Sequence, residues 1–476
     1  MTAWARHDAA LKGRPERSPG VSPGHPGFPV DPDFPQLPIA TDPAHMLDVF
    51  RAHLRPAPGR SVVIEDCIPF RFRCRQASAR CVLQYTLRLL DRASGRRWDQ
   101  AVAGIVYARA GEAERQWREI LTGDPVGEVP VEWRALQPVA FVPELDMLVE
   151  VFPYDRKLRH LRLVTGGSGV VSEIEPRLLA PLDGGEWEVT GRNIEPLRYR
   201  TELGAALRYT GQAVQRATGR RTTLRCYLKV YRDDRGAATW RLLRELSYQG
   251  AREYSVVAPI TYLGELRTLA IEQASGSPVV ELLLAGHDPA AVLRPVAKAV
   301  AAFNQRDIAG AAEHGRDRQL DEVRRAAGLV AWACPEVAED VDGIVAAVVA
   351  ALPEVAPAPI HRDLKADHVF LDRDRVVFID LDSVALGDPV RDPAHLYAYL
   401  TARVGLDGYP AGRVRAASAA FVQEYFARVP AAWRQRFAAH CAGALIEVAS
   451  GIFRRQEPEW RAKVIAAVGE ARRALK

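Results

Sequence analysis

The chain repeats one series of motifs in its first half. Segment 69–120 recurs in degenerate form at 196–246, with the motifs in the same order and at nearly constant spacing. Each copy predicts two or three strands joined by a Gly-containing turn and followed by a helix. Small β-sheets can share such alternation by chance, but the matching order favours a duplicated β-rich unit. The motifs are Pro69 to Arg73 and Pro196 to Arg200, Gln84-Tyr85-Thr86 and Arg208-Tyr209-Thr210, Ser94 to Arg97 and Thr218 to Arg221, and Val106-Tyr107 and Val230-Tyr231.

The two copies differ at a position that matters for chemistry. Aligning their Val-Tyr motifs places Lys229 of the second copy where the first copy has Ile105. A cation that can hold phosphate is therefore present once, and only the second copy is predicted to hold nucleotide in this way. Each copy also continues into an apolar strand with what we interpret as a similarly placed acid, Glu150 in the first and Glu272 in the second.

The remaining chain divides by composition. With 476 residues, the chain exceeds the size of a single core, so two or three domains are expected. A tail rich in Pro and Gly is predicted to form no packed element, the Gly-rich stretch 165–169 is predicted to link the copies, and Ala-rich helical periodicity follows the second copy. The predicted divisions are a tail at 1–42, a degenerate non-catalytic β-rich domain at 43–165, a second β-rich lobe at 170–276 and a helical lobe at 277–476.

Composition excludes several classes of protein. A net charge of +5 without basic runs interleaved with aromatic residues argues against nucleic acid as a partner. No apolar stretch is long enough to span a bilayer and no apolar signal core follows Met1, so we expect no membrane partner and a cytoplasmic location. The six cysteines form no metal-binding spacing and are interpreted as reduced thiols.

The richest group of polar motifs lies at 361–392. The octet from His361 to His368 is flanked by short apolar segments that predict strands, so Asp363 is expected at the tip of a supported loop. There it could orient an attacking hydroxyl and take its proton. Asp380 follows the apolar run 376–379, which predicts a carboxylate at the end of a buried strand, where Mg²⁺ bridging phosphates could be held.

The remaining parts of a nucleotide site are predicted upstream. Lys229 stands in a strand-like alternation, and such a lysine alone is more often a solvated edge residue. Glu245 follows on an amphipathic helix and could pair with Lys229, holding it at the α- and β-phosphates. Glu272, Gln273 and Ala274 are interpreted, from their position, as a connector between lobes whose backbone could bind adenine.

This ordered set resembles the aminoglycoside phosphotransferase and choline-kinase-like small-molecule kinases. The segment 361–365 also looks like a protein serine/threonine kinase loop. However, the segment from Gly387 to Asp392 is similar to the small-molecule family, and no Asp-Phe-Gly or Ala-Pro-Glu segment appears. The resemblance covers about 190–450. It implies an α+β, protein-kinase-like bilobal fold with a β-rich N-lobe and a mainly helical C-lobe, here preceded by an additional β-rich, N-lobe-like domain.

The resemblance also implies roles for individual residues. Asp363 would be the catalytic base, Lys365 would contact the transferred phosphoryl group and Asp380 would bind the metal, with ATP and Mg²⁺ as cofactors. Asp388 and Asp392 would brace the loop.

Two features depart from the family pattern. His368 stands where the family has a metal-binding Asn. The imidazole would favour Mn²⁺, would leave only one metal well held, or would contact a metal ligand rather than the metal itself. Asp382 is then an alternative ligand. The expected nucleotide loop, 200–205, contains a single Gly and would hold phosphate less closely.

The sequence therefore predicts an ATP-dependent phosphotransferase acting on a hydroxyl of a small molecule, such as a sugar, an aminoglycoside-like compound or an amino-alcohol. The alternative is a catalytically impaired pseudokinase that binds nucleotide or a metabolite as a regulatory module, for which His368 is the main argument. Protein kinase activity is a third and less favoured hypothesis. The N-terminal copy is expected to cap the cleft or to mediate self-association into a homo-oligomer.

Overall fold

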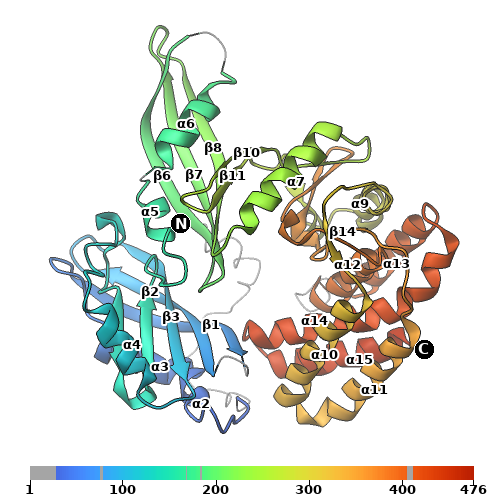
Figure 1. The fold of residues 1–476 in the computed structure, drawn as a ribbon, viewed down its shortest axis with the longest axis horizontal. Coiled ribbons are helices and arrows are strands. Elements are labelled where there is room, and N and C mark those ends of the chain that lie inside the picture. The colour runs from blue at the N-terminus through green and yellow to red at the C-terminus, as the bar shows by residue number, and fades with distance from the viewer. Residues whose placement is uncertain (1–27, 76–78, 168, 183–184, 405–410) are drawn as a thin grey trace. The chain divides into compact units, whose positions relative to one another are not determined.

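A computed structural model of the chain describes residues 28–75, 79–167, 169–182, 185–404 and 411–476. The chain divides into two compact units, one formed by residues up to 240 together with 259–273, and the other by 241–258 together with 274–476 (Figure 1). Each unit is described by itself.

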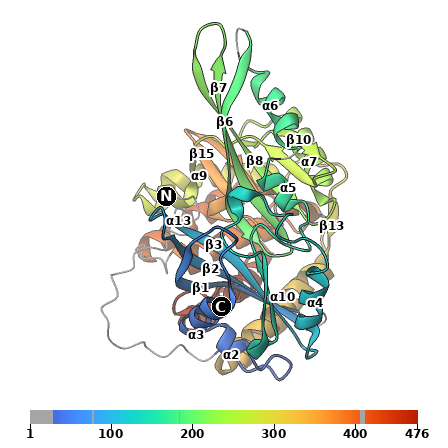
Figure 2. The same cartoon turned by 90° about the vertical axis from the view of Figure 1, so that its left-hand side faces the viewer.

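The first unit begins with a five-stranded antiparallel sheet in the order β1-β2-β3-β5-β4. Helix α4 covers one face, where Ala113 packs with Val82, Ile105 and Leu148. Helix α3 covers the other face (Figure 2). There the Phe50 and Tyr85 rings lie 4.9 Å apart. The elements are α2 (Leu37–Ala40), α3 (Pro43–His53), β1 (Val62–Arg75), β2 (Arg80–Asp91), β3 (Arg97–Tyr107), α4 (Glu112–Ile120), β4 (Val139–Val142) and β5 (Met147–Val151), with short 3₁₀ turns η3 (Val131–Trp133) and η4 (Pro143–Leu145).

A second five-stranded sheet in the same unit has the same connectivity. Its order is β6-β7-β8-β11-β10, and α7 follows β8 as α4 follows β3. The repeat seen in the motifs is therefore present as two sheets built in one way, and the β-rich part of the α+β prediction is confirmed. The elements are β6 (Trp187–Arg200), β7 (Gly204–Gln215), β8 (Arg221–Tyr231), α7 (Arg235–Gln249), β10 (Pro259–Leu263) and β11 (Thr268–Ile271).

The strand registers correct one predicted equivalence. Glu150 lies opposite Ala103 on β3, and the position equivalent to Ala103 on β8 is Tyr227, which faces Ile271. Glu150 therefore corresponds to Ile271, and Glu272 lies one residue beyond β11. The difference also appears in exposure, because Glu150 is buried and Glu272 is exposed. The pairing of these two acids was wrong by one residue.

The predicted linker at 165–169 is flanked by two packed helices, and its residue 168 lies outside the described part of the chain. It lies between α5 (Leu161–Thr165) and α6 (Val171–Leu179). Leu161, Val164 and Ile174 are buried in one apolar cluster with residues of the second sheet. The helices on either side of residue 168 are therefore held in place by the burial of these apolar side chains.

Part of the predicted tail also packs. Within 28–42, Phe34 and Leu37 are nearly inaccessible to solvent, and the Tyr85 hydroxyl donates a hydrogen bond to the Ala40 carbonyl at 2.7 Å. The prediction of a tail without packed elements was wrong for these residues, because apolar side chains between the prolines find a surface to cover. Residues 1–27 lie outside the described part of the chain.

The second unit is mainly helical, as predicted. Helix α14 is its centre and contacts α10, α11, α12 and α15. Two small sheets, β12-β15-β16-β9 and β13-β17-β14, lie beside the helices. The elements are β9 (Tyr254–Val256), β12 (Ser277–Pro278), α8 (Val279–Leu284), α9 (Pro289–Asn304), β13 (Ala312–His314), α10 (Arg316–Ala333), η5 (Pro335–Val337), α11 (Ala338–Ala351), β14 (Ala358–Ile360), η6 (Ala366–His368), β15 (Val369–Asp372), β16 (Arg375–Phe378), η7 (Leu381–Ser383), β17 (Ala385–Gly387), α12 (Arg391–Tyr399), the π-helix η8 (Leu400–Val404), α13 (Ala411–Phe426), η9 (Ala431–Arg436), α14 (Phe437–Arg454) and α15 (Trp460–Ala474).

Two further expectations can be compared with the structure. Cys67, Cys226, Cys334 and Cys441 are free and buried, as expected of reduced thiols, whereas Cys81 is disulfide-bonded, so the prediction was wrong there. Across the described ranges, no helix has both the length and the apolar character needed to cross a bilayer.

Candidate active site

The buried carboxylate of Asp392 holds the loop that carries Asp363. Asp392 is fully buried, and its side chain accepts hydrogen bonds from the backbone N–H groups of His361 (2.7 Å) and Arg362 (3.0 Å). The Asn304 amide donates a third, at 2.9 Å. Arg362 has a φ of +68°, a conformation that a non-glycine residue keeps only where its surroundings impose it. Asp392 therefore fixes the backbone immediately before Asp363, in the bracing role expected of it.

Three of the residues predicted to form the site lie close together. The ligand atoms of Asp363, His368 and Asp380 all lie within 4.8 Å of one another. His368 Nε2 lies 3.2 Å from Asp380 Oδ2, and His368 Nδ1 lies 3.6 Å from Asp363 Oδ2 and 2.9 Å from the Asp363 carbonyl oxygen. The ring of His368 is buried, whereas the two carboxylates remain partly exposed.

The hydrogen bonds of His368 indicate that a cation fits here. A neutral imidazole has one N–H, so it can donate either to the Asp363 carbonyl or to Asp380, and in either tautomer one nitrogen lone pair faces an oxygen lone pair. Protonation would satisfy both contacts, but burial, together with the nearby Lys365 ammonium, lowers the pKa of His368 to about 3. A metal ion bound by Nε2 and the carboxylates would remove the conflict, because nitrogen and oxygen donors can share a divalent ion.

Lys365 lies beside the predicted base. Its Nζ is 3.1 Å from Asp363 Oδ2. Burial alone would raise the pKa of Asp363, but the Lys365 ammonium and the nearby imidazoles outweigh it and hold that pKa well below its ordinary value. Asp363 is therefore ionised at neutral pH and available as a proton acceptor.

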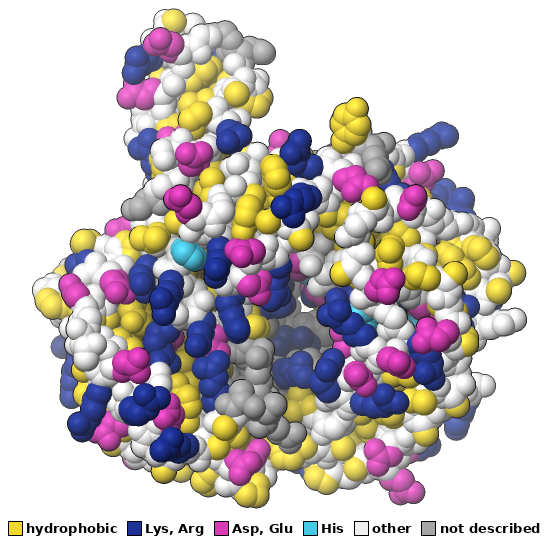
Figure 3. All heavy atoms as spheres, viewed as in Figure 1, with side chains coloured by type: hydrophobic (Ala, Val, Ile, Leu, Met, Phe, Trp, Pro, Cys, Tyr) yellow, Lys and Arg dark blue, Asp and Glu magenta, His cyan; other side chains and the backbone are white. Residues whose placement is uncertain are grey.

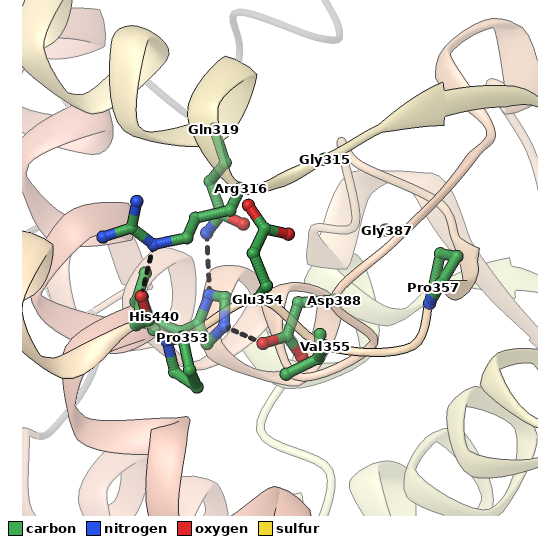
Figure 4. Close-up of a pocket in the computed structure, with 11 residues that line it drawn as sticks. Gly315, Arg316, Gln319, Pro353, Glu354, Val355, Pro357, Gly387, Asp388 and His440 are labelled. Atoms are coloured by element: carbon green, nitrogen blue, oxygen red, sulfur yellow. Dashed lines mark hydrogen bonds and ion pairs between the residues drawn. The ribbon is translucent and has the colours of Figure 1, made fainter.

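The predicted structural acid Asp388 anchors the segment after β17. Its carboxylate accepts hydrogen bonds from Arg436 at 2.6 and 3.0 Å, from His440 at 2.9 Å and from the Val390 N–H at 3.1 Å. Gln319 fixes the His440 ring from the other side, at 2.8 Å (Figure 4). Asp388, His440 and Gln319 border a pocket between the start of α10 and residues 352–357. None of the predicted catalytic or metal-binding residues lines this pocket.

The anchoring of Asp388 leads to a prediction about pH. Burial would raise the pKa of Asp388, but hydrogen bonds from His440 and Arg436 outweigh burial and hold that pKa well below its usual range. In the unfolded chain the pKa of Asp388 is about 3.9. Because the pKa in the folded protein is lower, ionised Asp388 contributes its full stabilisation at pH values above about 3.9, and this contribution decreases as the pH falls below about 3.9. Asp388→Asn should therefore cost about 3 kcal/mol of unfolding free energy at pH 7.

Urea unfolding of wild type and Asp388→Asn at pH 7, 5 and 3 checks this prediction. We expect the difference between the two proteins to be similar at pH 7 and 5 and clearly smaller at pH 3. A difference that stays constant down to pH 3 would show that the carboxylate is not the stabilising group.

Asp382 lies in η7 and is outside the cluster of Asp363, His368 and Asp380. Lys229 lies half-buried on β8 in the first unit. Helix α7 crosses from the first unit to the second after residue 240, and Glu245 lies on its second-unit part, so the pairing of Lys229 with Glu245 stays a prediction. The segment 272–274 follows β11, and the chain passes from the first unit to the second between Gln273 and Ala274, consistent with a connector. A role in binding adenine also stays a prediction.

Sequence reasoning missed several supporting residues. Asn304 is fully buried at the end of α9, where it donates to the Pro359 carbonyl and Asp392 and accepts from the Tyr425 hydroxyl. In the sequence it is visible only as the single amide of a helix whose other polar side chains are Arg294 and Lys298. His395 of α12 also supports the loop, because its Nδ1 lies 2.7 Å from the Leu364 carbonyl oxygen.

Comparison with known protein families decides the assignment. Residues 206–436 match the model described as the phosphotransferase enzyme family. This part of the chain is similar to a phosphotransferase-family domain. The match contains Lys229, the Asp363 cluster and the anchors Asp388 and Asp392, whereas the first sheet lies outside it. The resemblance and the kinase-type enzyme class predicted from the sequence are thereby confirmed.

Solved structures similar to the chain include three phosphotransferases. One is a choline/ethanolamine kinase family protein from Mesorhizobium loti, at 14% identity and a TM-score of 0.40, covering 64% of this chain and 95% of that chain. The macrolide 2'-phosphotransferase of Brachybacterium faecium shows 18% identity and a TM-score of 0.39, covering 62% and 98%. Aminoglycoside phosphotransferase APH(3'')-Id of Streptomyces rimosus shows 19% identity and a TM-score of 0.35, covering 53% and 92%. None of the curated proteins matches the chain.

Proposed function

We propose that the phosphotransferase-like part of the chain transfers the γ-phosphoryl group of ATP to a hydroxyl of a small molecule, with Mg²⁺ or Mn²⁺. The observation that carries this proposal is the cluster of Asp363, His368 and Asp380. In either neutral tautomer of His368, one ring nitrogen lone pair faces an oxygen atom of Asp363 or Asp380. His368 and Asp380 would hold the metal, with Asp382 as an alternative ligand. A bound divalent ion would neutralise charge on the phosphates.

The protein side chains would orient the reaction. Asp363 would accept a hydrogen bond from the acceptor hydroxyl and take its proton as the new bond forms, a role for which its ionised state suits it. Lys365, 3.1 Å from Asp363, would contact the transferred group. Lys229 would pair with phosphate oxygens of the nucleotide.

Transfer to a small molecule can be tested with a panel of acceptors. Wild-type protein is incubated with ATP, Mg²⁺ or Mn²⁺ and single compounds drawn from sugars, aminoglycosides, macrolides, choline and ethanolamine. ADP formation that depends on one compound, with a new phosphomonoester of that compound, supports the proposal. Because residues 401–476 carry more basic than acidic side chains, we expect a neutral or anionic acceptor rather than a polycation.

The pseudokinase hypothesis rests on His368 and is separated by the same assay. Nucleotide-dependent thermal stabilisation without turnover on any acceptor would favour a regulatory module.

Replacing His368 should change the preferred metal. Mg²⁺ prefers oxygen ligands, whereas an imidazole is better suited to Mn²⁺. His368→Asn should therefore raise the ratio of the Mg²⁺-supported rate to the Mn²⁺-supported rate by about tenfold, the lower end of the effects seen when groups around a bound metal are changed. Initial rates at saturating ATP with each metal measure this ratio. His395→Asn, which changes a histidine outside the metal-binding cluster, is the matched control. An unchanged ratio in His368→Asn would remove His368 from the metal site.

A further inference from the structure

The turn between β6 and β7 lies next to Lys229. Ala206 of β7 is directly opposite Lys229 of β8, and Gly204 is opposite Tyr231, so the turn at 201–203 begins a few residues along the same strand pair. A Cβ at Gly204 would come 2.9 Å from the Val230 carbonyl oxygen, so glycine is needed where the strands meet closely. A displacement of this turn would shift the start of β7 and with it the backbone beside Lys229.

Residues before α5, in the N-terminal part of the first unit, hold this turn. Asp155 Oδ2 accepts the Glu202 N–H at 2.7 Å and the Tyr199 hydroxyl at 2.8 Å. The Gln84 amide donates to the Tyr199 carbonyl at 3.0 Å, and Arg80 pairs with the Glu202 carboxylate at 2.8 Å. We call Arg80, Gln84 and Asp155 the clamp residues.

The clamped turn has little contact with solvent. Thr201 and Glu202 are 4% and 2% exposed, and Asp155 is 1% exposed. Glu202 has a φ of +62°, which is unfavourable for a residue with a side chain. Such a conformation persists when surrounding groups determine it, and here the N–H and the carboxylate of Glu202 are both bonded to clamp residues.

The two five-stranded sheets pack against each other through a permanent apolar interface. Phe152, beside the clamp, packs on Tyr199 with ring centroids 5.1 Å apart. Both rings belong to one apolar cluster that also contains Ala101 of the first sheet and Leu207 of the second. Separating the sheets would expose this cluster to water, which is unfavourable, so the two sheets do not separate easily.

We propose that the N-terminal sheet is a fixed brace for the nucleotide-binding turn, and that Asp155 is the positioning residue that sets the affinity for nucleotide phosphates. This inference rests on the proposed function. It gives the N-terminal sheet a role in nucleotide binding, which the sheet exerts through the turn beside Lys229. The clamp residues contact the turn and not the nucleotide, so their effect is transmitted through the backbone of 199–204.

Asp155→Asn separates this role from a purely structural one. Calorimetric titration of the full chain is carried out with adenosine and with ATP in the presence of Mn²⁺ and no acceptor. Loosening the turn should weaken ATP binding by about tenfold and leave adenosine binding within about twofold. The reason is that the turn lies near Lys229, which would pair with the phosphates that adenosine lacks. Asp99→Asn, which changes a carboxylate paired with Arg88 in the same sheet, should leave both affinities unchanged.

A second variant protects the test against loss of folding. Arg80→Met removes the ion pair to Glu202 from a side chain that is 19% exposed, and should also weaken ATP more than adenosine. Unchanged ATP affinity in both variants, or an equal loss for ATP and adenosine, would overturn the brace. Tighter ATP binding would also overturn it, because it would mean that the clamp keeps the turn from phosphate. A wild-type chain that binds adenosine but not ATP would contradict the proposed function itself.

Discussion

Asp363→Asn should lower the rate of phosphoryl transfer by about 10³-fold, the usual contribution of a positioned general base. The substitution keeps the size of the side chain and removes the charge that accepts the hydroxyl proton. Because Asp392 and Asn304 fix the loop independently of Asp363, the backbone should stay in place. Steady-state rates at saturating ATP and acceptor measure the loss.

The matched control is Asp367→Asn in the same loop. The Asp367 carboxylate accepts a hydrogen bond from the Tyr399 hydroxyl at 2.5 Å and lies outside the metal-binding cluster, so we expect a change of only a few fold. ATP affinity should be similar in wild type, Asp363→Asn and Asp367→Asn. Undiminished transfer in Asp363→Asn would refute the assigned base.

Asp392→Ala should have the largest effect on stability. It removes the acceptor of the His361 and Arg362 backbone N–H groups and of one N–H of the Asn304 amide, which keeps its bond to the Pro359 carbonyl. Each buried unsatisfied donor costs about 1–3 kcal/mol, so we expect a loss of about 4 kcal/mol together with loss of activity. Urea unfolding monitored by tryptophan fluorescence and circular dichroism measures the change.

Asp374→Ala serves as the comparison for that variant. Asp374 is exposed between β15 and β16, where a surface substitution changes stability by about 0.5 kcal/mol or less. A cost for Asp392→Ala as small as that of Asp374→Ala would mean that Asp392 does not hold the catalytic loop.

The local pattern of the chain predicted most of the catalytic loop. Short apolar runs on either side of 361–368 are strands β14 and β15, and Asp380 does follow strand β16. The repeat was also visible, because matching motifs with constant spacing place equivalent residues in equivalent strands. Ile105 shows the value of that comparison, because it is buried in the apolar cluster under α4, where the second copy has Lys229.

The sequence did not predict contacts between distant elements. Nothing in the segment around Asp155 distinguishes it from a loop acid, and its bonds to Tyr199 and Glu202 arise only when the two sheets pack together. The equivalence of Glu150 and Glu272 failed for a related reason. Motif spacing does not fix strand register, and a shift of one residue moves a side chain to the opposite face.

Labelled phosphate tests the central claim most directly. Wild type and Asp363→Asn are incubated with [γ-³²P]ATP, Mn²⁺ or Mg²⁺, and a deproteinised extract of small molecules supplemented with the acceptor panel. We predict a labelled low-molecular-mass product with wild type, and none with Asp363→Asn or after chelation of the metal. Label found only on protein, or an equal amount of small-molecule product with Asp363→Asn, would contradict a small-molecule phosphotransferase that acts through Asp363.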